Sequence, residues 1–556
     1  MSAILFHGNN LPTSITDSFR ADKYAIDYTQ NAQNPNFVLD RFIHDSLDKA
    51  LQNKFYDIIF IPYTLSQHNY LELTGLRVAI HIRVTKEFKH ACVPIVFIGP
   101  ESSTQIAKLT ELGNILFTPG VFYTAKTDSE YLKKLCEWIK EQKPKITEAE
   151  WEKCLRRLQL SPPANYDSHH SIDNELALLR WSECIGCVDQ IAEVKENIQK
   201  NLYFKYQRTL NPIKPINQVK YSIQGKAKIL LIDDEAEKGW KDFYTHFFSD
   251  SPKIEFDYLK LNFKTLSQDD ISERAKNEVE KSHADIVLLD LRLCDTDFES
   301  ELKPENLTGY KILKEIKKIN KGIQIIIISA SNKVWNYQSL HSIGANGYII
   351  KRGNSDVIED IKNLKQVIEK AIERANYLKD AFQKIKSLSY SINDSISNDK
   401  IDKKFGEELI KFLELSFRMY ENSQTREEFA FAYLALFKSL ELISNNYVIN
   451  DSGTWRVVGN HPLKQYKWDK QTNTYKETNP PNFKNNIPTT FEKIAGLCLQ
   501  LWNYDHEFVE QLYYSIKCRN EFIHPSDESE CEKIYIPKGY LYLLDQIVKL
   551  GNKITT

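Results

Sequence analysis

Four apolar segments between residues 226 and 353 each end on polar side chains, and this pattern constrains the chain more than any other feature. The runs AKILLI, DIVLL, IQIIII and GYII have the composition of interior strands in a parallel sheet, and helix-patterned segments separate them. The polar residues at or near the ends of these runs are Asp233, Asp234, Asp290, Ser329, Tyr348 and Lys351. Strands that alternate with helices predict a doubly wound, flavodoxin-like α/β fold, in which the carboxyl ends of the strands meet at one edge. We therefore expect these side chains to converge.

The three carboxylates indicate a metal-dependent phosphoryl acceptor. Crowded carboxylates repel one another unless a hard cation such as Mg²⁺ lies among them. The cation would neutralise charge on an incoming phosphoryl group, so that one carboxylate can act as a nucleophile and form an aspartyl phosphate. We expect Asp290 to be the nucleophile and Asp233 and Asp234 to hold Mg²⁺ with it. Lys351 would pair with the phosphoryl oxygens, and the Ser329 hydroxyl would bond to one of them.

This constellation resembles the receiver domain of two-component response regulators, over residues 226–354. The resemblance implies a histidine kinase as phosphodonor and a switch in which Ser329 and Tyr348 move once phosphate is attached. Two features depart from the family pattern: the segment between Asp290 and Gly309 is long and acidic, and Arg352 follows the lysine where the family has proline. A receiver fold that no longer takes phosphate is the alternative.

The first 126 residues repeat the same pattern. The runs SAILFHGNN, FYDIIFIPY, VPIVFIGPES and GNILFTPGV match the four strand segments in order, and Gly75 corresponds to Gly309. The polar residues are replaced by His7 and Gly8 at the acid pair, Pro62 at the nucleophile, Gly99 at the hydroxyl and Thr118 at the lysine. Without carboxylates there is neither a metal site nor an acceptor. We expect a pseudo-receiver that binds a partner or another copy of the chain, with a small-molecule site as the alternative.

Two helical stretches flank the central domain. Residues 127–225 are predicted to be a helical connector and linker, with a capping box at Thr147 and Glu150 and a helix that runs from about Ile172 to Ile198. The CxxC pair in this helix, Cys184 and Cys187, has no second pair at zinc spacing, so burial is favoured over a zinc or redox role. Residues 355–390 predict one long helix with an uninterrupted apolar stripe. Such a helix either pairs with its copy in a dimer or lies on the next domain.

Residues 391–556 are all-α in pattern, a helical bundle with an insert at about 448–486. One bundle helix ends in CRNEFIHP, which places Arg519, Asn520 and His524 together. The R-N-x-x-x-H motif resembles the HEPN family (higher eukaryotes and prokaryotes nucleotide-binding), many of whose members are metal-independent ribonucleases with a site formed between two copies. His524 could move a proton, Arg519 could hold a phosphate, and Asn520 could orient the base or the phosphate.

The insert of the bundle mixes aromatic and lysine side chains on a predicted hairpin. Aromatic rings can stack on bases while lysines contact phosphates, so the hairpin could hold single-stranded RNA. A solvated hairpin that only covers the bundle fits the same pattern. The sequence leaves both interpretations open.

Charge and hydropathy exclude several classes of protein. The 73 basic and 75 acidic residues give a net charge of −2, so the chain has no global field that would attract nucleic acid. No basic recognition helix ends the chain, which disfavours DNA binding. There is no apolar run long enough to span a membrane and no signal-peptide pattern at the amino terminus, so we expect a cytoplasmic protein without a membrane partner.

Three hypotheses follow for the whole chain. The first is a homodimeric response regulator that a histidine kinase phosphorylates on Asp290 and that controls a HEPN-like domain able to cleave RNA, in stress or antiphage defence. The alternative is a phosphorylation-controlled binding scaffold without nuclease activity. A third is a toxin-neutralising or nucleotidyl-transfer module that depends on a second protein.

Overall fold

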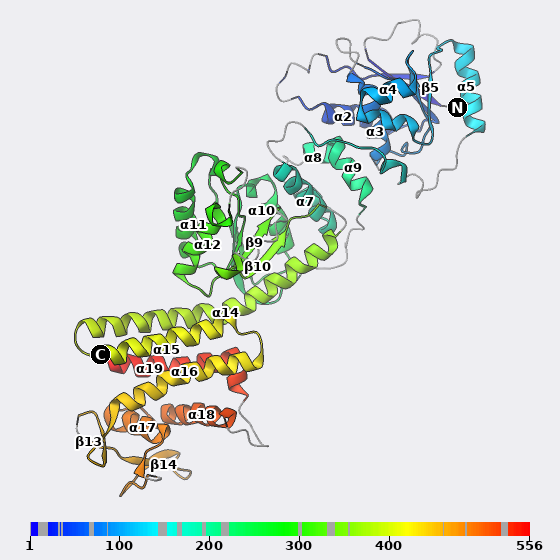
Figure 1. Ribbon diagram of the computed structural model, residues 1–556. Coiled ribbons are helices and arrows are strands. Elements are labelled where there is room, and N and C mark those ends of the chain that lie inside the picture. The colour runs from blue at the N-terminus through cyan, green and yellow to red at the C-terminus, as the bar shows by residue number, and fades with distance from the viewer. Residues whose placement is uncertain are drawn as a thin grey trace.

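The computed structural model has two α/β domains followed by a helical region, arranged in chain order (Figure 1). It describes the chain except residues 1, 9–20, 30, 32–33, 35–36, 66–71, 86, 143–152, 164–168, 192–195, 213–221, 299–302, 331–339, 354–355, 460, 484–485, 524–531 and 556. Among the residues that it describes, no helix has both the length and the apolar character needed to cross a membrane.

The amino-terminal domain contains a five-stranded parallel sheet in the order β2-β1-β3-β4-β5. The strands are β1 (Ala3–His7), β2 (Asp22–Ala25), β3 (Ile58–Pro62), β4 (Ile95–Ile98) and β5 (Val121–Thr124). The helical segments are α2 (Leu39–Leu51), α3 (Thr74–Val84), α4 (Ser103–Leu109), the 3₁₀ segment η2 (Glu111–Phe117) and α5 (Ser129–Glu141). Helices α2 and α3 pack on one face of the sheet and α5 packs on the other.

The central domain repeats this topology, because its sheet has the order β10-β9-β8-β6-β7 and is also parallel. Its strands are β6 (Ala227–Ile232), β7 (Ile254–Tyr258), β8 (Ile286–Leu289), β9 (Gln324–Ser329) and β10 (Gly347–Ile350). Its helices are α10 (Trp240–Phe247), α11 (Gln268–Ser282) and α12 (Thr308–Ile319). Counted from its own first strand, each sheet has the order 2-1-3-4-5. The predicted internal repeat and α/β fold are therefore present.

The alternating direction of side chains along the strands explains why helices cover both faces of the central sheet. Ile229 and Leu231 of β6 pack with α10, whereas Leu230 and Ile232 pack with α11 and α12. Successive side chains of a strand point to opposite faces, so a continuous apolar run fills two cores. The polar residues that follow these runs are left at the strand ends, at the sheet edge.

The connector helix predicted from about Ile172 to Ile198 is broken into shorter segments. Helix α7 (His169–Ile185) ends before Gly186, whose φ of 74° lies in the left-handed region that stops a helix. The 3₁₀ segment η3 (Val188–Gln190), α8 (Glu196–Lys200) and α9 (Leu202–Leu210) follow. Helix α7 packs with α10 of the central domain, and α9 packs with α3 of the amino-terminal domain. The predicted capping box at residues 147–150 lies outside the described residues.

A buried polar network fixes α9 to the amino-terminal domain. The Lys205 ammonium donates to Nδ1 of His44 at 2.6 Å and to the Thr85 hydroxyl at 3.0 Å. Asp40 accepts two hydrogen bonds from Arg77, at 2.5 and 2.9 Å, and one from the backbone N–H of Leu202 at 3.1 Å. These contacts join the connector to both α2 and α3.

Helix α14 (Val357–Ser397, 41 residues) contributes to the cores of two domains. Its first half, from Val357 to Ile372, packs in the core of the central domain, and its second half, from Leu378 to Ile392, packs in the core of the helical region. The apolar stripe is therefore buried within the chain. The sequence left two alternatives for this stripe: pairing with a second copy of the chain, or packing on the next domain. In the structure the stripe packs on the next domain and is not exposed for a second copy.

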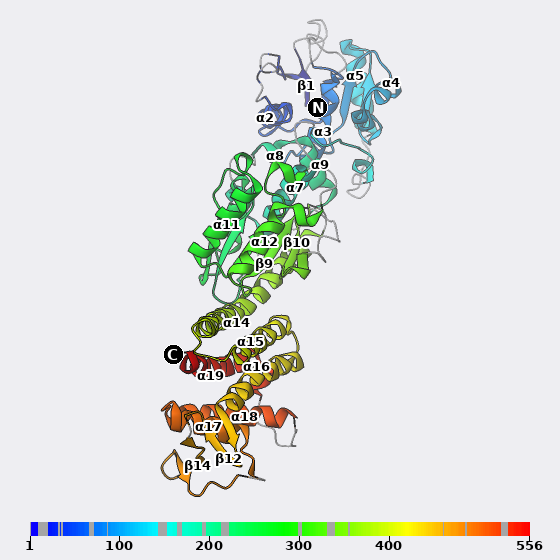
Figure 2. The same ribbon diagram turned by 60° about the vertical axis from the view of Figure 1, so that its left-hand side comes forward.

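The carboxyl-terminal region is helical but not all-α. Its helices are α15 (Lys403–Asn422), α16 (Arg426–Tyr447), α17 (Thr490–Gly496), the π-helical segment η10 (Leu497–Leu501), α18 (His506–Ile523), the 3₁₀ segment η11 (Lys533–Tyr535) and α19 (Pro537–Thr555). The insert forms strands β11 (Val448–Asp451), β12 (Thr454–Val457), β13 (His461–Pro462), β14 (Gln465–Asp469) and β15 (Thr474–Thr478). These strands make two small antiparallel sheets at the far end of the region (Figure 2), so the predicted all-α bundle is incomplete as a description.

The central domain is joined to the helical region at the corner between α12 and β9. The Asn320 side chain donates to the Lys379 carbonyl of α14 at 3.1 Å, and the Lys379 ammonium pairs with Asp285 at 2.5 Å. At Gly322 a Cβ would lie 2.4 Å from the Leu378 carbonyl carbon, so only glycine allows this close approach. The corner therefore holds α14 where it passes from one domain into the next.

Candidate functional site

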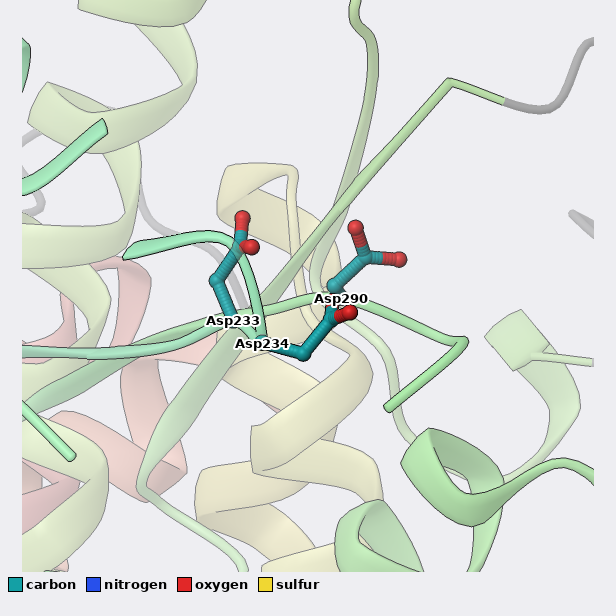
Figure 3. A group of neighbouring side chains, drawn as sticks. All are labelled: Asp233, Asp234 and Asp290. Atoms are coloured by element: carbon teal, nitrogen blue, oxygen red, sulfur yellow. The ribbon is translucent and has the colours of Figure 1, made fainter. Parts of the chain in front are cut away.

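The carboxyl ends of β6 and β8 bring three aspartates together. Ile232 pairs with Leu289 in the sheet, which sets Asp233 and Asp290 side by side one residue later. Each of Asp233, Asp234 and Asp290 offers a carboxylate oxygen within 4.8 Å of the others (Figure 3). Asp233 and Asp290 are buried, and Asp234 is partly exposed. The predicted cluster of acids is therefore present at this edge.

Lys351 completes the cluster from the end of β10. Its ammonium lies 2.7 Å from Oδ2 of Asp233 and 3.2 Å from Oδ2 of Asp290, and it is buried above the ring of Trp240. The backbone N–H of Leu291 donates to Oδ1 of Asp290 at 2.5 Å, and that of Arg292 donates to it at 3.2 Å. These bonds fix the orientation of the Asp290 carboxylate.

The electrostatics of the cluster show an uncompensated negative charge. Burial, together with Asp233, raises the pKa of Asp290 to about 6, although Lys351 opposes the shift. Burial and the charges of Asp233 and Asp290 raise the pKa of Asp234 to about 9. Burial lowers the pKa of Lys351, but the two facing carboxylates raise it by more. The positive charge of the Lys351 ammonium can offset the negative charge of only one of the three carboxylates.

The donor set fits a Mg²⁺ ion. Mg²⁺ prefers oxygen ligands, of which one or two carboxylates are commonly supplied by the protein. A divalent cation would offset the carboxylate charge that Lys351 leaves over and would favour the ionised form of Asp234, and Asp233, Asp234 and Asp290 are the residues that would hold it. When bound, such an ion supplies charge neutralisation for phosphoryl transfer.

We predict that, without a divalent cation, Asp234 and Asp290 contribute a loss of stability as the pH rises above about 4. Because the pKa values of Asp234 and Asp290 are raised in the fold, the native state retains protons that the unfolded chain has released. The loss should continue until both groups have titrated, near pH 9. Urea unfolding in EDTA and in Mg²⁺ measures it, and Mg²⁺ should flatten the curve.

The control for this pH dependence is Asp234→Asn, which removes one of the titrating groups. In EDTA its unfolding free energy should depend less on pH than that of the wild type. A pH dependence between about pH 5 and pH 9 in EDTA that is the same in the wild type and in Asp234→Asn would contradict the electrostatic account.

The two predicted switch residues contact one another. Ser329 is the last residue of β9 and is buried, and its carbonyl accepts a hydrogen bond from the backbone N–H of Lys351 at 2.8 Å. The side chains of Tyr348 and Ser329 are hydrogen-bonded. Burial and the nearby Asp290 raise the pKa of Tyr348 to about 12, so the phenol stays protonated. Ser329 and Tyr348 thus contact one another, and Tyr348 lies close to Asp290; their role as switch residues stays a prediction.

Asp297 organises the long segment after Asp290, and the sequence analysis missed its role. Its Oδ2 accepts hydrogen bonds from the backbone N–H groups of Leu293 at 2.9 Å and Cys294 at 3.2 Å. Its Oδ1 accepts from the N–H of Thr308 at 3.0 Å and from the Gln268 side chain at 2.9 Å. The buried carboxylate thereby ties the segment to the start of α12. No local sequence signal distinguishes it from its exposed neighbour Asp295.

Asp297→Ala is predicted to destabilise the central domain by about 3 kcal/mol, since it leaves buried N–H groups without an acceptor and each costs about 1–3 kcal/mol. Asp295→Ala in the same segment is the matched control and should change stability by no more than about 0.5 kcal/mol. Urea unfolding measures both variants. Equal effects would show that the Asp297 contacts contribute little.

Gly309 and Gly75 have the same place in the two α/β domains. A Cβ on Gly309 would lie 2.4 Å from the carbonyl oxygen of Asp290, and a Cβ on Gly75 would lie 1.8 Å from that of Pro62. In each domain the helix begins directly against the residue that ends the third strand. This match makes Pro62 the counterpart of Asp290, as the sequence predicts.

The structure corrects one position of the amino-terminal repeat. Residues 111–117 form the 3₁₀ segment η2, and the fifth strand is Val121–Thr124. Ile98 pairs with Thr124, so the residue in register with Lys351 is Lys126 and not Thr118. Lys126 is exposed and lies over the Tyr131 ring at 5.4 Å, away from any acid pair of the kind seen at Lys351.

An aromatic side chain fills the sheet edge of the amino-terminal domain. A Cβ on Gly99, the counterpart of Ser329, would lie 2.3 Å from the Tyr63 ring, which stacks on Phe97 with centroids 5.5 Å apart. Pro62 and His7 supply no carboxylate there. Among the described residues, the positions that match Asp233, Asp290 and Ser329 therefore carry no carboxylate or hydroxyl, and the Tyr63 ring occupies the space beside Gly99.

Comparison with protein families supports a receiver-type fold for each of the two α/β domains. The inactive receiver domain family matches residues 10–124, and the response regulator receiver domain family matches residues 260–363. The chain contains two receiver-type domains. The second match begins after β6, and the structure supplies the missing first strand with Asp233 and Asp234 at its end.

Solved structures with similarity to the chain include receiver-containing proteins. A signal receiver domain from Vibrio parahaemolyticus has 20% identity, covers 27% of this chain and 93% of its own, and has a TM-score of 0.20. NtrX from Brucella abortus has 24% identity, covers 27% of this chain and has a TM-score of 0.20. The match spans only 28% of the NtrX chain. No curated protein matches the chain.

Arg519 and Asn520 lie together on α18, whereas His524 falls outside the described residues. The Arg519 guanidinium pairs with Glu441 of α16 at 2.8 Å, donates to the Asn520 side chain at 3.0 Å and lies over the Phe437 ring. The sequence analysis did not identify Glu441 as the partner of Arg519. An acid one helix turn after Phe437 was the available signal.

Two lysines of the insert, Lys464 and Lys476, have acidic partners. Lys464 pairs with Glu477 at 2.7 Å, Lys476 pairs with Asp469, and Tyr475 is buried. Phosphate contacts would have to displace these acids. The interpretation as a hairpin that covers the bundle is therefore favoured over an RNA-binding hairpin.

The CxxC pair is part of a core. Cys184 and Cys187 are buried and not disulfide-bonded, and burial raises the pKa of the Cys187 thiol to about 11. A thiol that stays protonated is a poor nucleophile and a poor metal ligand. Packing is therefore the favoured interpretation of this pair, as predicted.

Proposed function

We propose that this protein is a response regulator whose second receiver domain accepts a phosphoryl group on Asp290 from a histidine kinase. The observation that supports this most is the buried Lys351 ammonium, which contacts Asp233 and Asp290 while Asp234 lies beside them. A degenerate receiver would have lost an acid or the lysine. The residues required for phosphoryl transfer are all present in one cluster.

The residues of the cluster have distinct tasks in the proposed reaction. A carboxylate oxygen of Asp290 forms the bond to phosphorus, and the donor's leaving group departs with the electrons of the broken bond. The N–H groups of Leu291 and Arg292 keep the carboxylate oriented during attack. Lys351 then pairs with a phosphoryl oxygen, and the Ser329 hydroxyl donates to another. Asp233, Asp234 and Asp290 would hold Mg²⁺.

The proposed signal leaves the site through β9, β10 and α14. When the Ser329 hydroxyl turns toward the phosphoryl group, its contact with Tyr348 changes, which alters the β9–β10 edge. Ile326, Ile328 and Ile349 of these strands pack in the same core as the first half of α14. Phosphorylation would therefore favour the conformation in which α14 is shifted. Because α14 is one continuous helix, the shift would reach the carboxyl-terminal region.

For the output we propose RNA cleavage in a HEPN-like region. Arg519 would stabilise negative charge on the phosphate, His524 would move a proton, and Asn520 would orient the substrate. The Arg519–Glu441 ion pair supports a gated site, because phosphate must replace Glu441 as the partner of the guanidinium. A role in stress or antiphage defence follows only from the family resemblance, and a homodimer is part of this proposal.

We predict that His524→Ala lowers cleavage of labelled RNA by about 100-fold or more, the usual contribution of a general acid or base. His461→Ala, at an exposed histidine in the insert, is the matched control and should cleave like the wild type. The assay uses the full chain with and without a small phosphodonor. Cleavage that persists in His524→Ala would remove the nuclease assignment.

A binding scaffold is the second candidate, and the Arg519–Glu441 ion pair is the observation that favours it. A guanidinium that is already paired with a carboxylate can serve as a helix-to-helix contact and nothing more. A scaffold would take phosphate on Asp290 but would cleave no RNA in either state. The same assay therefore separates the two candidates.

A further inference from the structure

A groove lies at the joint between the second receiver domain and the helical region. Its volume is about 540 Å³, within the usual range for small-molecule sites. Three segments line it: the corner after α12, the second half of α14, and α15. None of the residues that line the groove belongs to the cluster of Asp233, Asp234 and Asp290.

The lining of the groove combines cationic, aromatic and hydroxyl side chains. Lys321, Lys386 and Arg418 bring one cation from each of the three segments, against the single acid Glu414. Tyr390 is 76% exposed on α14, so its ring is open to solvent at the groove. The Oγ of Ser389 also lines the groove; it is buried and has no hydrogen-bond partner among the described residues.

We propose that this groove binds a nucleoside phosphate. The three cations suit a phosphate chain, and arginine can hold two oxygens of one phosphate at once. The exposed Tyr390 ring offers a stacking surface for a base. Glu414 is an acceptor for ribose hydroxyls, and the unpaired Ser389 hydroxyl is a buried polar group that a ligand can satisfy.

The binding site would couple the two domains. Lys321 belongs to the receiver corner and Arg418 to α15, so a ligand that contacts both would bridge the joint. The same joint is held by the Lys386 ammonium, which donates to the Ile319 carbonyl at 3.3 Å, and by Asn320, which donates to the Lys379 carbonyl at 3.1 Å. A bound nucleotide would therefore add to the contacts that fix α14 relative to the receiver domain.

Isothermal titration of the full chain with ATP in EDTA tests the proposal, because EDTA removes binding that depends on a divalent cation. We expect micromolar affinity for ATP and at least tenfold weaker binding of adenosine or tripolyphosphate. Arg418→Glu should weaken ATP binding at least tenfold. Tyr390→Ala should weaken it about tenfold, the loss expected for one stacked base.

Lys404→Glu is the charge-matched control, since Lys404 is exposed on α15 outside the groove lining. It should bind ATP like the wild type. Arg418 and Tyr390 are exposed, so both variants should keep the wild-type melting temperature. The proposal is overturned if ATP does not bind or if Arg418→Glu binds it with wild-type affinity. It is also overturned if tripolyphosphate binds as tightly as ATP and Tyr390→Ala has no effect.

Discussion

Asp290→Asn is expected to reduce phosphorylation by a small phosphodonor to background. The amide has nearly the shape of the carboxylate, so the fold should persist, but it lacks the nucleophilic oxygen that attacks phosphorus. The carboxylate lies where β8 ends, held by the N–H groups of Leu291 and Arg292 and faced by Lys351. Phosphate-affinity electrophoresis after incubation with acetyl phosphate and Mg²⁺ measures the shifted fraction.

Asp295→Asn is the matched control for this experiment. It makes the same chemical change five residues later, at an exposed position in the first turn of a 3₁₀ segment. We expect it to be phosphorylated like the wild type. If Asp290→Asn retains phosphorylation, the acceptor lies elsewhere and the proposed role of the cluster fails.

Lys351→Ala is expected to lower the unfolding free energy by about 3–5 kcal/mol in EDTA, the cost of removing one partner from a buried ion pair. The buried ammonium contacts Asp233 and Asp290, so its loss leaves three carboxylates without a cation. The repulsion among them opposes folding unless some become protonated. Urea unfolding measures the loss, and added Mg²⁺ should restore part of it.

The control is Lys362→Ala, at an exposed lysine on α14 whose ion pair with Glu359 is open to solvent. Surface pairs contribute at most about 1 kcal/mol, so this variant should behave like the wild type. A Lys351→Ala variant that loses less than about 1 kcal/mol, with or without Mg²⁺, would contradict the charge balance described for the cluster.

The positions of the central site residues could be predicted from the sequence because they depend on local features of the chain. An apolar run that fills two cores must be an interior strand, and its polar end must lie at the sheet edge. Asp233, Asp290 and Lys351 are each directly next to such a run, so their convergence follows from the strand order alone. Thr118 was wrongly matched to Lys351 because the apolar segment that includes Ile115, Leu116 and Phe117 resembles a strand but folds as a 3₁₀ helix, and Lys126 has that place instead.

Other features depend on contacts between distant residues. The apolar stripe of α14 has the same period whether it packs on its own chain or on a second copy, and only the structure shows the α15 and α19 helices beside it. Asp297 and Glu441 look like ordinary acids until their partners, Thr308 and Arg519, are brought close by the fold. Gly186 breaks the predicted connector helix through its positive φ.

The most direct test of the account is to locate the phosphoryl group on the chain. Acyl phosphates formed with acetyl phosphate and Mg²⁺ can be reduced with borohydride, which converts the modified aspartate to homoserine that mass spectrometry identifies. We predict one modified position, Asp290, and none in residues 1–126. An unmodified Asp290, or a label in the amino-terminal domain, would contradict the division into one active and one inactive receiver.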